Sequence, residues 1–279
     1  MHPVLFSIFG IKIPTYGVLV AVGFALGVWV AVRQARRENV PPELVLDLAF
    51  WVLVSALVGS RLLYILVNLG HYIQEPLDLL KVWKGGLVFY GGFLGAVAAS
   101  WVFCLKNHLS FWQIADLSIP SLALGHFWGR LGCYSAGCCH GRPTGLEHFG
   151  AIFTEHHTVV ARSGLLGQPL HPTQLYEALG ELMLFLLLAL WRPRRRRQGE
   201  LLVLWLMAYA ALRFGVEMFR GDMERGMLMW INLFGDEWPE LLSTSQLVAL
   251  IMLVGGVAIW MKIPHLKKEK EAEKISSGI

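Results

Sequence analysis

The stretch YGVLVAVGFALGVWVAV, Tyr16 to Val32, carries no charged side chain over seventeen residues. At ~1.5 Å of rise per residue, a helix of this length is close to the thickness of the hydrocarbon core of a bilayer. Six further apolar stretches of similar length follow it along the chain. We therefore predict seven membrane-spanning helices, at Tyr16–Val32, Leu44–Leu69, Leu87–Leu105, Phe111–Tyr134, Leu175–Trp191, Leu201–Phe219 and Gln246–Met261.

The composition agrees with a protein that lies in lipid. Hydrophobic residues make up 55% of the chain and charged residues only 16%, with a mean hydropathy of +0.53, which excludes an ordinary soluble domain. The net charge of +4 is carried by short basic runs between apolar stretches, a pattern typical of topology signals and not of nucleic-acid binding. The sequence predicts an all-α integral membrane protein with no nucleic-acid partner. The N-terminus lacks a basic region and a cleavage site, so we expect the first span to stay in the mature protein.

The distribution of Lys and Arg predicts the orientation. The loops after the first, third and fifth spans and the C-terminal tail carry fourteen of the twenty-four basic residues, and the opposite loops carry seven. Basic residues in short loops stay on the cytoplasmic side. We therefore expect the N-terminus outside, the tail 262–279 in the cytoplasm, and one polytopic domain over 1–279. The long Gly-, Pro- and His-rich segment 135–174, together with 220–245, is expected to form a small extracytoplasmic cap.

With this orientation, unusual polar motifs gather at the outer ends of five spans. They are Tyr16, GGLVFYGGFLG at 85–95, GRLGC at 129–133, HPTQLYE at 171–177 and RFGVEMFR at 213–220. Ionisable residues inside membrane segments are expensive, and they usually mark functional sites. We therefore expect one polar site at this depth.

Three charged residues form a stripe on the sixth span. Arg213, Glu217 and Arg220 are spaced i, i+4 and i+7, which places them on one helix face. Two other readings remain open: an ion pair between Arg213 and Glu217 that locks the helices, and an Arg220 side chain that extends to the interface.

Arg130 in the fourth span adds a second membrane arginine, flanked by Gly129 and Gly132, which permit close approach of a ligand or helix. Two arginines from separate helices suit a phosphate, because the planar guanidinium offers forked donors. Arg61 in the second span is expected to be structural.

The glycine cluster around Tyr90 does not form a nucleotide-binding loop, because it leads directly into a membrane span instead of following a strand. We expect Gly85 and Gly86 to allow an irregular backbone, and Gly91 and Gly95 to form a small-residue packing face. Tyr90 is either an interfacial aromatic anchor or a hydrogen-bonding group of the site.

Three cysteines and a histidine follow the fourth span in GRLGCYSAGCCHGRPT, Gly129 to Thr144. Four such donors can bind zinc, but no C-x-x-C is present and the adjacent Cys138 and Cys139 are unfavourably spaced for one ion. We therefore expect no metal site. A disulfide from Cys133 to Cys138 or Cys139 stays open, and small semi-polar packing is the preferred interpretation.

In their order along the chain, these motifs resemble the bacterial phosphatidylglycerol:prolipoprotein diacylglyceryl transferase family, from about Tyr16 to Val257. The resemblance implies a multi-pass inner-membrane enzyme without a cofactor. It would move the diacylglyceryl group of phosphatidylglycerol to the lipobox cysteine of prolipoprotein signal peptides and release glycerol phosphate. Many members have His at the position of Tyr90, Asn at Cys133 and Glu at Cys138. The identity of the general base therefore stays open, with His140 and His171 as alternative proton acceptors.

The predicted site has a catalytic set and a substrate-binding set. The catalytic residues are Arg130, Arg213, Glu217 and Tyr90. The substrate-binding residues are Tyr16, Arg220, Gly85, Gly86, Gly91, Gly92, Cys133, Gly141 and His171. The substrate thiolate would attack the glycerol carbon, while Arg130 and Arg213 stabilise the leaving phosphate.

Three other functions are weighed against this enzyme. An anionic-lipid transporter would place its site near the midplane and repeat its halves, and no repeat is evident. A membrane peptidase would need its own nucleophile and base, but no G-x-S-x-G or H-E-x-x-H is present. A non-catalytic phospholipid-binding protein remains the strongest alternative.

Overall fold

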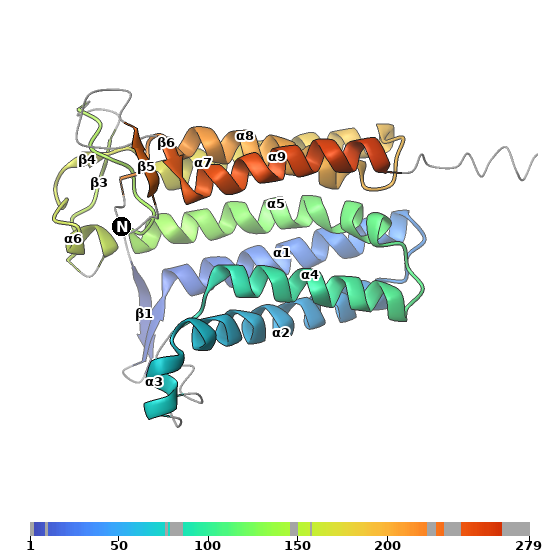
Figure 1. The fold of residues 1–279 in the computed structure, drawn as a ribbon, viewed down its shortest axis with the longest axis horizontal. Coiled ribbons are helices and arrows are strands. Elements are labelled where there is room, and N and C mark those ends of the chain that lie inside the picture. The colour runs from blue at the N-terminus through green and yellow to red at the C-terminus, as the bar shows by residue number, and fades with distance from the viewer. Residues whose placement is uncertain are drawn as a thin grey trace, which may run out of the picture. The chain divides into compact units, whose positions relative to one another are not determined.

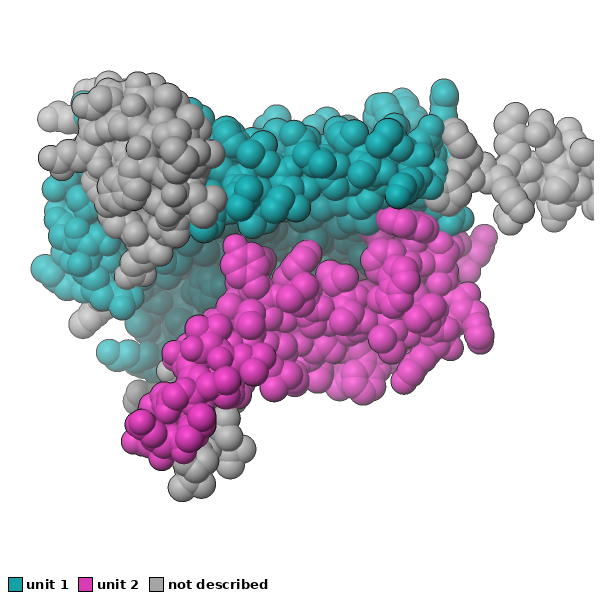
Figure 2. Space-filling view, viewed as in Figure 1, with its two compact units in different colours: residues 1–27, 118–279 teal, residues 28–117 magenta. Residues whose placement is uncertain are grey.

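A computed structural model describes residues 3–8, 11–75, 78, 86–145, 150–156, 158–221, 227–231 and 241–263. Its chain divides into two compact units. One unit contains residues 1–27 and 118–279, and the other contains residues 28–117 (Figure 2). Two helices, α1 (Thr15–Arg37) and α5 (Phe111–Ala136), contribute to both.

The 28–117 unit is built on two long helices, α2 (Pro42–Val67) and α4 (Phe89–Lys106), with the short α3 (Leu69–Gln74) after α2. Glycines bring α2 and α4 together. A Cβ added at Gly91 would collide with the Gly59 carbonyl, and one added at Gly95 would collide with the Ser55 carbonyl. The predicted small-residue packing face at Gly91 and Gly95 is confirmed.

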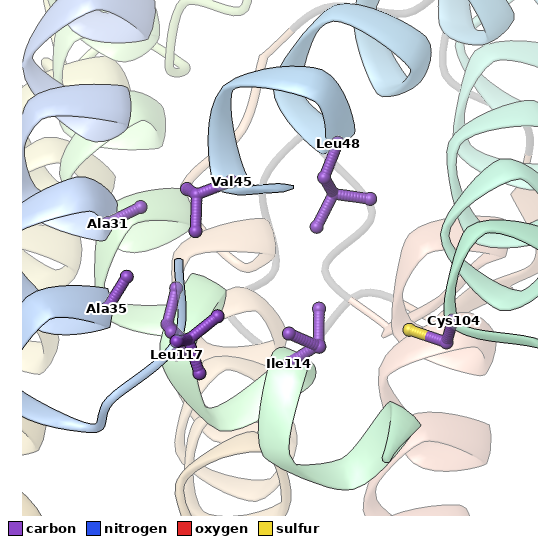
Figure 3. Close-up of a cluster of buried hydrophobic side chains, with 8 residues drawn as sticks. Ala31, Ala35, Val45, Leu48, Cys104, Ile114 and Leu117 are labelled. Atoms are coloured by element: carbon purple, nitrogen blue, oxygen red, sulfur yellow. The ribbon is translucent and has the colours of Figure 1, made fainter. Parts of the chain in front are cut away.

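A compact apolar cluster fills one end of this unit, as Figure 3 shows. Side chains from α1, α2, α4 and α5 meet there, and Ala35 and Leu117 are fully buried. Cys104 of α4 belongs to this cluster and is 2% exposed. It is therefore a core residue of this unit.

The other unit contains α7 (Thr173–Trp191), α8 (Glu200–Glu217) and α9 (Thr244–Lys262), which lie side by side in Figure 1. Leu201 and Trp205 of α8 pack with Ile119 and Ala123 of α5 and Leu188 of α7. A capping box stabilises the start of α9, because the Ser243 hydroxyl accepts from the Gln246 backbone N–H and the Gln246 side chain accepts from the Ser243 N–H.

Short strands and helices complete the described residues. The strands form three antiparallel pairs: β1 (Val4–Ile8) with β2 (Ile11–Pro14), β3 (Ala151–Ile152) with β4 (Pro169–Leu170), and β5 (Met227–Ile231) with β6 (Leu241–Ser243). The short helices are α6 (Val159–Arg162) and the 3₁₀ turn η3 (Arg192–Arg194). The all-α prediction is therefore correct for the long elements and missed these pairs, which are too short to produce a clear alternating pattern.

A helix lies at each of the seven predicted spans, with ends that differ by a few residues. Five of them, α1, α2, α4, α7 and α9, are long and apolar enough to cross a membrane. Large apolar side chains on these helices are exposed, including Leu66 (59%), Leu94 (63%) and Val254 (69%). Such surface is stable in lipid and costly in water, so the protein is a multi-pass membrane protein.

Candidate functional site

A ladder of polar pairs joins α5 to α7. His126 Nδ1 lies 2.6 Å from Oε1 of Glu181, and one turn further along α5, Arg130 Nη2 donates to Oε1 of Glu177 at 2.6 Å. The two helices run antiparallel, because four residues forward on α5 match four residues backward on α7. The Arg130 Nε–H donates to His126 Nε2 at 3.2 Å, which requires the tautomer with its proton on Nδ1.

Helix α8 adds a second ladder to the same carboxylates. The Trp205 Nε1–H donates to Glu181 at 3.2 Å, and the Tyr209 hydroxyl donates to Glu177 at 3.1 Å. One turn further, Arg213 Nη1 lies 3.6 Å from the second oxygen of Glu177. Glu177 is thus shared by arginines from two helices, Arg130 of α5 and Arg213 of α8.

Arg213 also forms the ion pair on its own helix that the sequence left open. Its Nη2 lies 2.8 Å from Glu217 Oε2 and donates to the Ser245 hydroxyl at 2.9 Å. The Glu217 side chain is fully buried. Together with the contact to Glu177, this pair holds the Arg213 guanidinium between two carboxylates.

The arginines and the carboxylates differ in exposure. The side chains of Arg130 and Arg213 are 14% and 12% exposed, whereas Glu177 is 2% exposed. The carboxylate therefore lies behind the guanidiniums. A guanidinium has five N–H donors, and among the described residues Arg130 uses only its Nε and Nη2 nitrogens. The Nη1 nitrogen of Arg130 thus has no hydrogen-bond partner among the described residues, while the carboxylates hold both guanidiniums in position.

A tight backbone network encloses the loop after α5. The Gly141 N–H donates to the His171 carbonyl, the Arg142 N–H to the Phe219 carbonyl, and the Gly221 N–H to the His140 carbonyl. Gly141 also forms an isolated β-bridge with Arg220. A Cβ at Gly141 would collide with the His171 carbonyl and side chain, so only glycine fits there. This loop thereby joins the ends of α5 and α8 to the start of α7.

The structure brings together the sulfurs of Cys133, in the last turn of α5, and of Cys138 and Cys139 in this loop. The Sγ atoms of Cys133, Cys138 and Cys139 lie within 4.8 Å of one another, and all three thiols are free. Hydrogen bonds from Cys133 and Cys138 lower the pKa of the Cys139 thiol, and burial opposes them. Although the adjacent Cys138 and Cys139 are unfavourably spaced along the chain for one ion, both of their sulfurs lie near that of Cys133. Cys139 has a left-handed backbone, with φ of 57°, and this changes the direction of its side chain.

The two candidate histidines of this loop region differ. The His140 ring is fully buried, with Nδ1 3.0 Å from the Gly141 carbonyl and Nε2 3.4 Å from the Ser163 hydroxyl. His171 is partly exposed and has its Nδ1 3.2 Å from the Tyr176 hydroxyl. Burial, and then the positive charge of Arg142, lower the pKa of His171. His171 is therefore the more exposed of the two rings, and its neutral form is favoured.

Tyr16 belongs to the same unit as the arginines. It lies in the first turn of α1, and a Cβ added at Gly132 would meet its ring at 3.0 Å. The Tyr16 side chain is 44% exposed. The close approach at Gly132 places this phenol beside the end of α5, two residues after Arg130.

The predicted residues around Tyr90 belong to the 28–117 unit. Tyr90 is 52% exposed and packs edge-on against Phe89. Gly86 has φ of 83°, as an irregular backbone requires, while Gly91 and Gly92 are buried against α2. Gly85 lies outside the described residues.

Arg61 has the contacts of a structural residue in the same unit. Its guanidinium donates to the carbonyls of Asp78 and Gly86 and lies over the rings of Tyr64 and Tyr72.

The sequence reasoning missed the central carboxylates. Glu177 and Glu181 are spaced i, i+4 inside an apolar span, and that spacing was a usable signal for a buried polar face. His126 also belongs to the polar ladder. Tyr209 and Trp205 could not be recognised as site residues from the sequence, because aromatic residues are common in membrane helices.

Comparisons with known proteins identify the family of this chain. The family model described as prolipoprotein diacylglyceryl transferase matches residues 3–262. A phosphatidylglycerol–prolipoprotein diacylglyceryl transferase of Finegoldia magna is 34% identical over 94% of this chain and 96% of that protein. Proteins of the same name from Geobacillus kaustophilus and Pseudoalteromonas atlantica are each 34% identical, over 90% and 98% of this chain and 88% and 92% of their own lengths. The chain therefore belongs to the prolipoprotein diacylglyceryl transferase family.

Proposed function

We propose that this protein transfers the diacylglyceryl group of phosphatidylglycerol to the cysteine thiol of a prolipoprotein and releases glycerol phosphate. The names of its relatives support this function. The observation that carries it is the convergence of Arg130 and Arg213, from two helices, on the buried carboxylate of Glu177. This geometry holds two guanidiniums at one place in a largely apolar protein.

The chemistry follows from the charge that develops during transfer. The acceptor sulfur attacks the glycerol carbon that carries the phosphate, and the C–O bond breaks toward the phosphate oxygen. A phosphodiester becomes a monoester and gains negative charge. Preorganised cationic donors in a site with little water stabilise that charge strongly. Arg130 and Arg213 supply these donors, while Glu177 and Glu217 keep them in position.

The other predicted residues take supporting roles in this proposal. Tyr90 is a hydrogen-bonding group and Tyr16 contacts substrate beside the end of α5. The remaining substrate-binding positions are Arg220, Gly85, Gly86, Gly91, Gly92, Cys133, Gly141 and His171. Gly141 acts by letting the backbone of the loop after α5 approach His171.

The proposal includes a membrane topology. All seven predicted spans cross the inner membrane of a bacterium as one polytopic domain, with the N-terminus outside and the tail 262–279 in the cytoplasm. The segment 135–174 forms the extracytoplasmic cap. α5 and α8 carry ionisable side chains of the polar ladders, which are paired with the carboxylates of α7 and so can lie within the membrane.

A transfer assay tests the function directly. The purified protein is mixed with phosphatidylglycerol vesicles and a signal peptide that carries a lipobox cysteine. We expect a thioether-linked diacylglyceryl peptide and an equal amount of glycerol phosphate, and no product from the same peptide with serine in place of cysteine. Binding of phosphatidylglycerol without any product would identify a non-catalytic lipid-binding protein instead.

A further inference from the structure

Three thiols lie at the end of α5 and in the loop after it, and the transfer step described above assigns no chemistry to their sulfur atoms. Cys133 lies on the last turns of α5, and Cys138 and Cys139 lie just beyond its end. All three are half-buried, and their sulfurs lie within 4.8 Å of one another. Among the described residues this is the one group of His, Cys, Asp and Glu side chains whose geometry suits a metal ion.

The backbone of this loop is held rigidly from α7. The Thr173 hydroxyl donates to the Cys139 carbonyl at 2.8 Å, and the Gln174 amide donates to the Cys138 carbonyl at 2.7 Å. Both α7 side chains are 1% exposed. Cys139 is also kept in a left-handed conformation that costs free energy for a residue with a Cβ. Buried hydrogen bonds thus maintain a strained backbone that directs two adjacent thiols toward a third.

The dimensions fit a thiophilic ion. With Zn–S bonds of about 2.3 Å, the sulfurs of a tetrahedral site lie about 3.8 Å apart, so the observed separations need to close by about 1 Å at most. His140 does not complete the set, because its ring nitrogens lie near the Gly141 carbonyl and the Ser163 hydroxyl. Three protein ligands and an open fourth position are typical of a catalytic zinc ion, whereas structural zinc sites have four protein ligands.

We propose that Cys133, Cys138 and Cys139 bind one Zn²⁺ ion whose fourth position takes the thiol of the acceptor cysteine. This role rests on the proposed transferase function. Cys133 follows Arg130 by three residues on α5, so the two side chains are neighbours on the helix surface. The Arg130 guanidinium turns toward His126 and Glu177 but is close enough to Cys133 and Cys139 to interact with their charges, so an acceptor sulfur on the ion would lie in the same region as the guanidinium assigned to the phosphate. Attack at the carbon beside that phosphate requires this proximity.

The step balances without an oxidant or reductant. A thiol that coordinates zinc loses its proton, and that proton passes to solvent or to the departing phosphate. The sulfur lone pair forms the S–C bond, and the electrons of the C–O bond leave on the oxygen of glycerol phosphate. Zinc remains Zn²⁺ throughout. The ion would thus supply the activation of the nucleophile for which no histidine is present at Tyr90.

Metal content is the first test, and it does not depend on activity. The full-length protein is purified in detergent with a phosphine reductant, loaded with Zn²⁺, desalted and analysed for metal and free thiols. We expect one zinc per chain and more than a tenfold loss of affinity in Cys133→Ser, Cys138→Ser and Cys139→Gly. Glycine suits the positive φ of Cys139, so the last variant should keep the fold. Cys104→Ser, in the core of the other unit, is the control that keeps its zinc. The site would be overturned if the reduced protein bound no zinc, or if it bound copper instead of zinc.

Coordination of the acceptor is the second test. Co²⁺-loaded protein should show a change in its sulfur-to-metal charge-transfer band on adding the lipobox peptide, and no change with the serine peptide. Chelation should lower transfer more than tenfold and Zn²⁺ should restore it. Undiminished transfer by metal-free protein would overturn this role and leave the transferase function intact. Stoichiometric zinc that responds to the cysteine peptide, in a protein that forms no product, would support the site and overturn the proposed function.

Discussion

The carboxylate of Glu177 lies 2.6 Å from the Nη2 nitrogen of Arg130 and is almost completely buried. Its other oxygen lies 3.6 Å from Arg213. One acidic side chain from α7 therefore sets the positions of two arginines on α5 and α8. Without a counter-charge, two guanidiniums in an apolar environment would repel each other and would each lose hydration.

Replacing either arginine by lysine tests the phosphate site. Lysine keeps the charge but replaces a planar fork of donors with a point charge. We expect Arg130→Lys and Arg213→Lys each to lower the transfer rate about 10²- to 10³-fold, measured in vesicles with protein that is folded and inserted. Arg197→Lys is the matched control, because Arg197 contacts Trp260 by its guanidinium at the other end of α8. Near-normal transfer by both site variants would exclude the two-arginine site.

Removing the charge of Glu177 should affect both stability and activity. Glu177→Gln keeps the shape and the Tyr209 contact but leaves Arg130 and Arg213 without their shared anion. Breaking a buried pair in this way costs about 3 kcal/mol, so we expect a lower unfolding temperature in detergent together with slower transfer. Glu155→Gln, at an exposed carboxylate of the loop after β3, should change neither quantity. An unchanged unfolding temperature for Glu177→Gln would contradict the bridging role.

The fall of the unfolding temperature at acid pH should depend on His171. The pKa of His171 is lowered in the folded protein by burial and by Arg142, so the unfolded chain binds more protons between the two pKa values. The stabilising contribution is fully present above the unfolded pKa of about 6.5, and it is lost as pH falls from there through the lower pKa of the folded protein. We expect His171→Gln to flatten the fall of the unfolding temperature below that pH, whereas His108→Asn, in the exposed turn after α4, leaves it unchanged. A fall of the same slope at acid pH in His171→Gln would remove this assignment.

Gly141 should not tolerate a side chain. A methyl group there would collide with the His171 carbonyl and displace the loop after α5. Overpacking of this kind costs about 1–3 kcal/mol, and we expect transfer to fall with it. Gly255→Ala in α9, where a Cβ meets nothing within 4 Å, provides the control. Equal transfer rates in the two variants would show that the loop accommodates the change.

Reporter fusions test the orientation. A reporter active only outside the cytoplasm should be inactive after Lys262 and active when inserted after Gly145, in the predicted cap. The physical reason is the retention of basic loops on the cytoplasmic side. Activity of the reporter after Lys262 would reverse the topology and move the site to the cytoplasmic face.

The sequence by itself determined the membrane class, the positions of the long helices and the residues with exceptional cost in lipid. Apolar runs fix helix length directly, since backbone groups in a bilayer must form hydrogen bonds within their own segment. An isolated arginine in such a run, such as Arg130 or Arg213, can be recognised from the sequence as a residue that needs a polar partner, because its desolvation in lipid is costly.

The tertiary structure alone decided which partner each charge has. Glu177 and Glu181 were ordinary residues of α7 until the antiparallel pairing with α5 placed them opposite Arg130 and His126. The adjacency of Cys138 and Cys139 argued against a common centre, and a loop with two left-handed residues, Gly137 and Cys139, places their sulfurs near Cys133. The helical period and the spacing along the chain describe one helix or loop at a time. The pairing of helices and a local change in φ depend instead on tertiary packing, which sequence spacing does not encode.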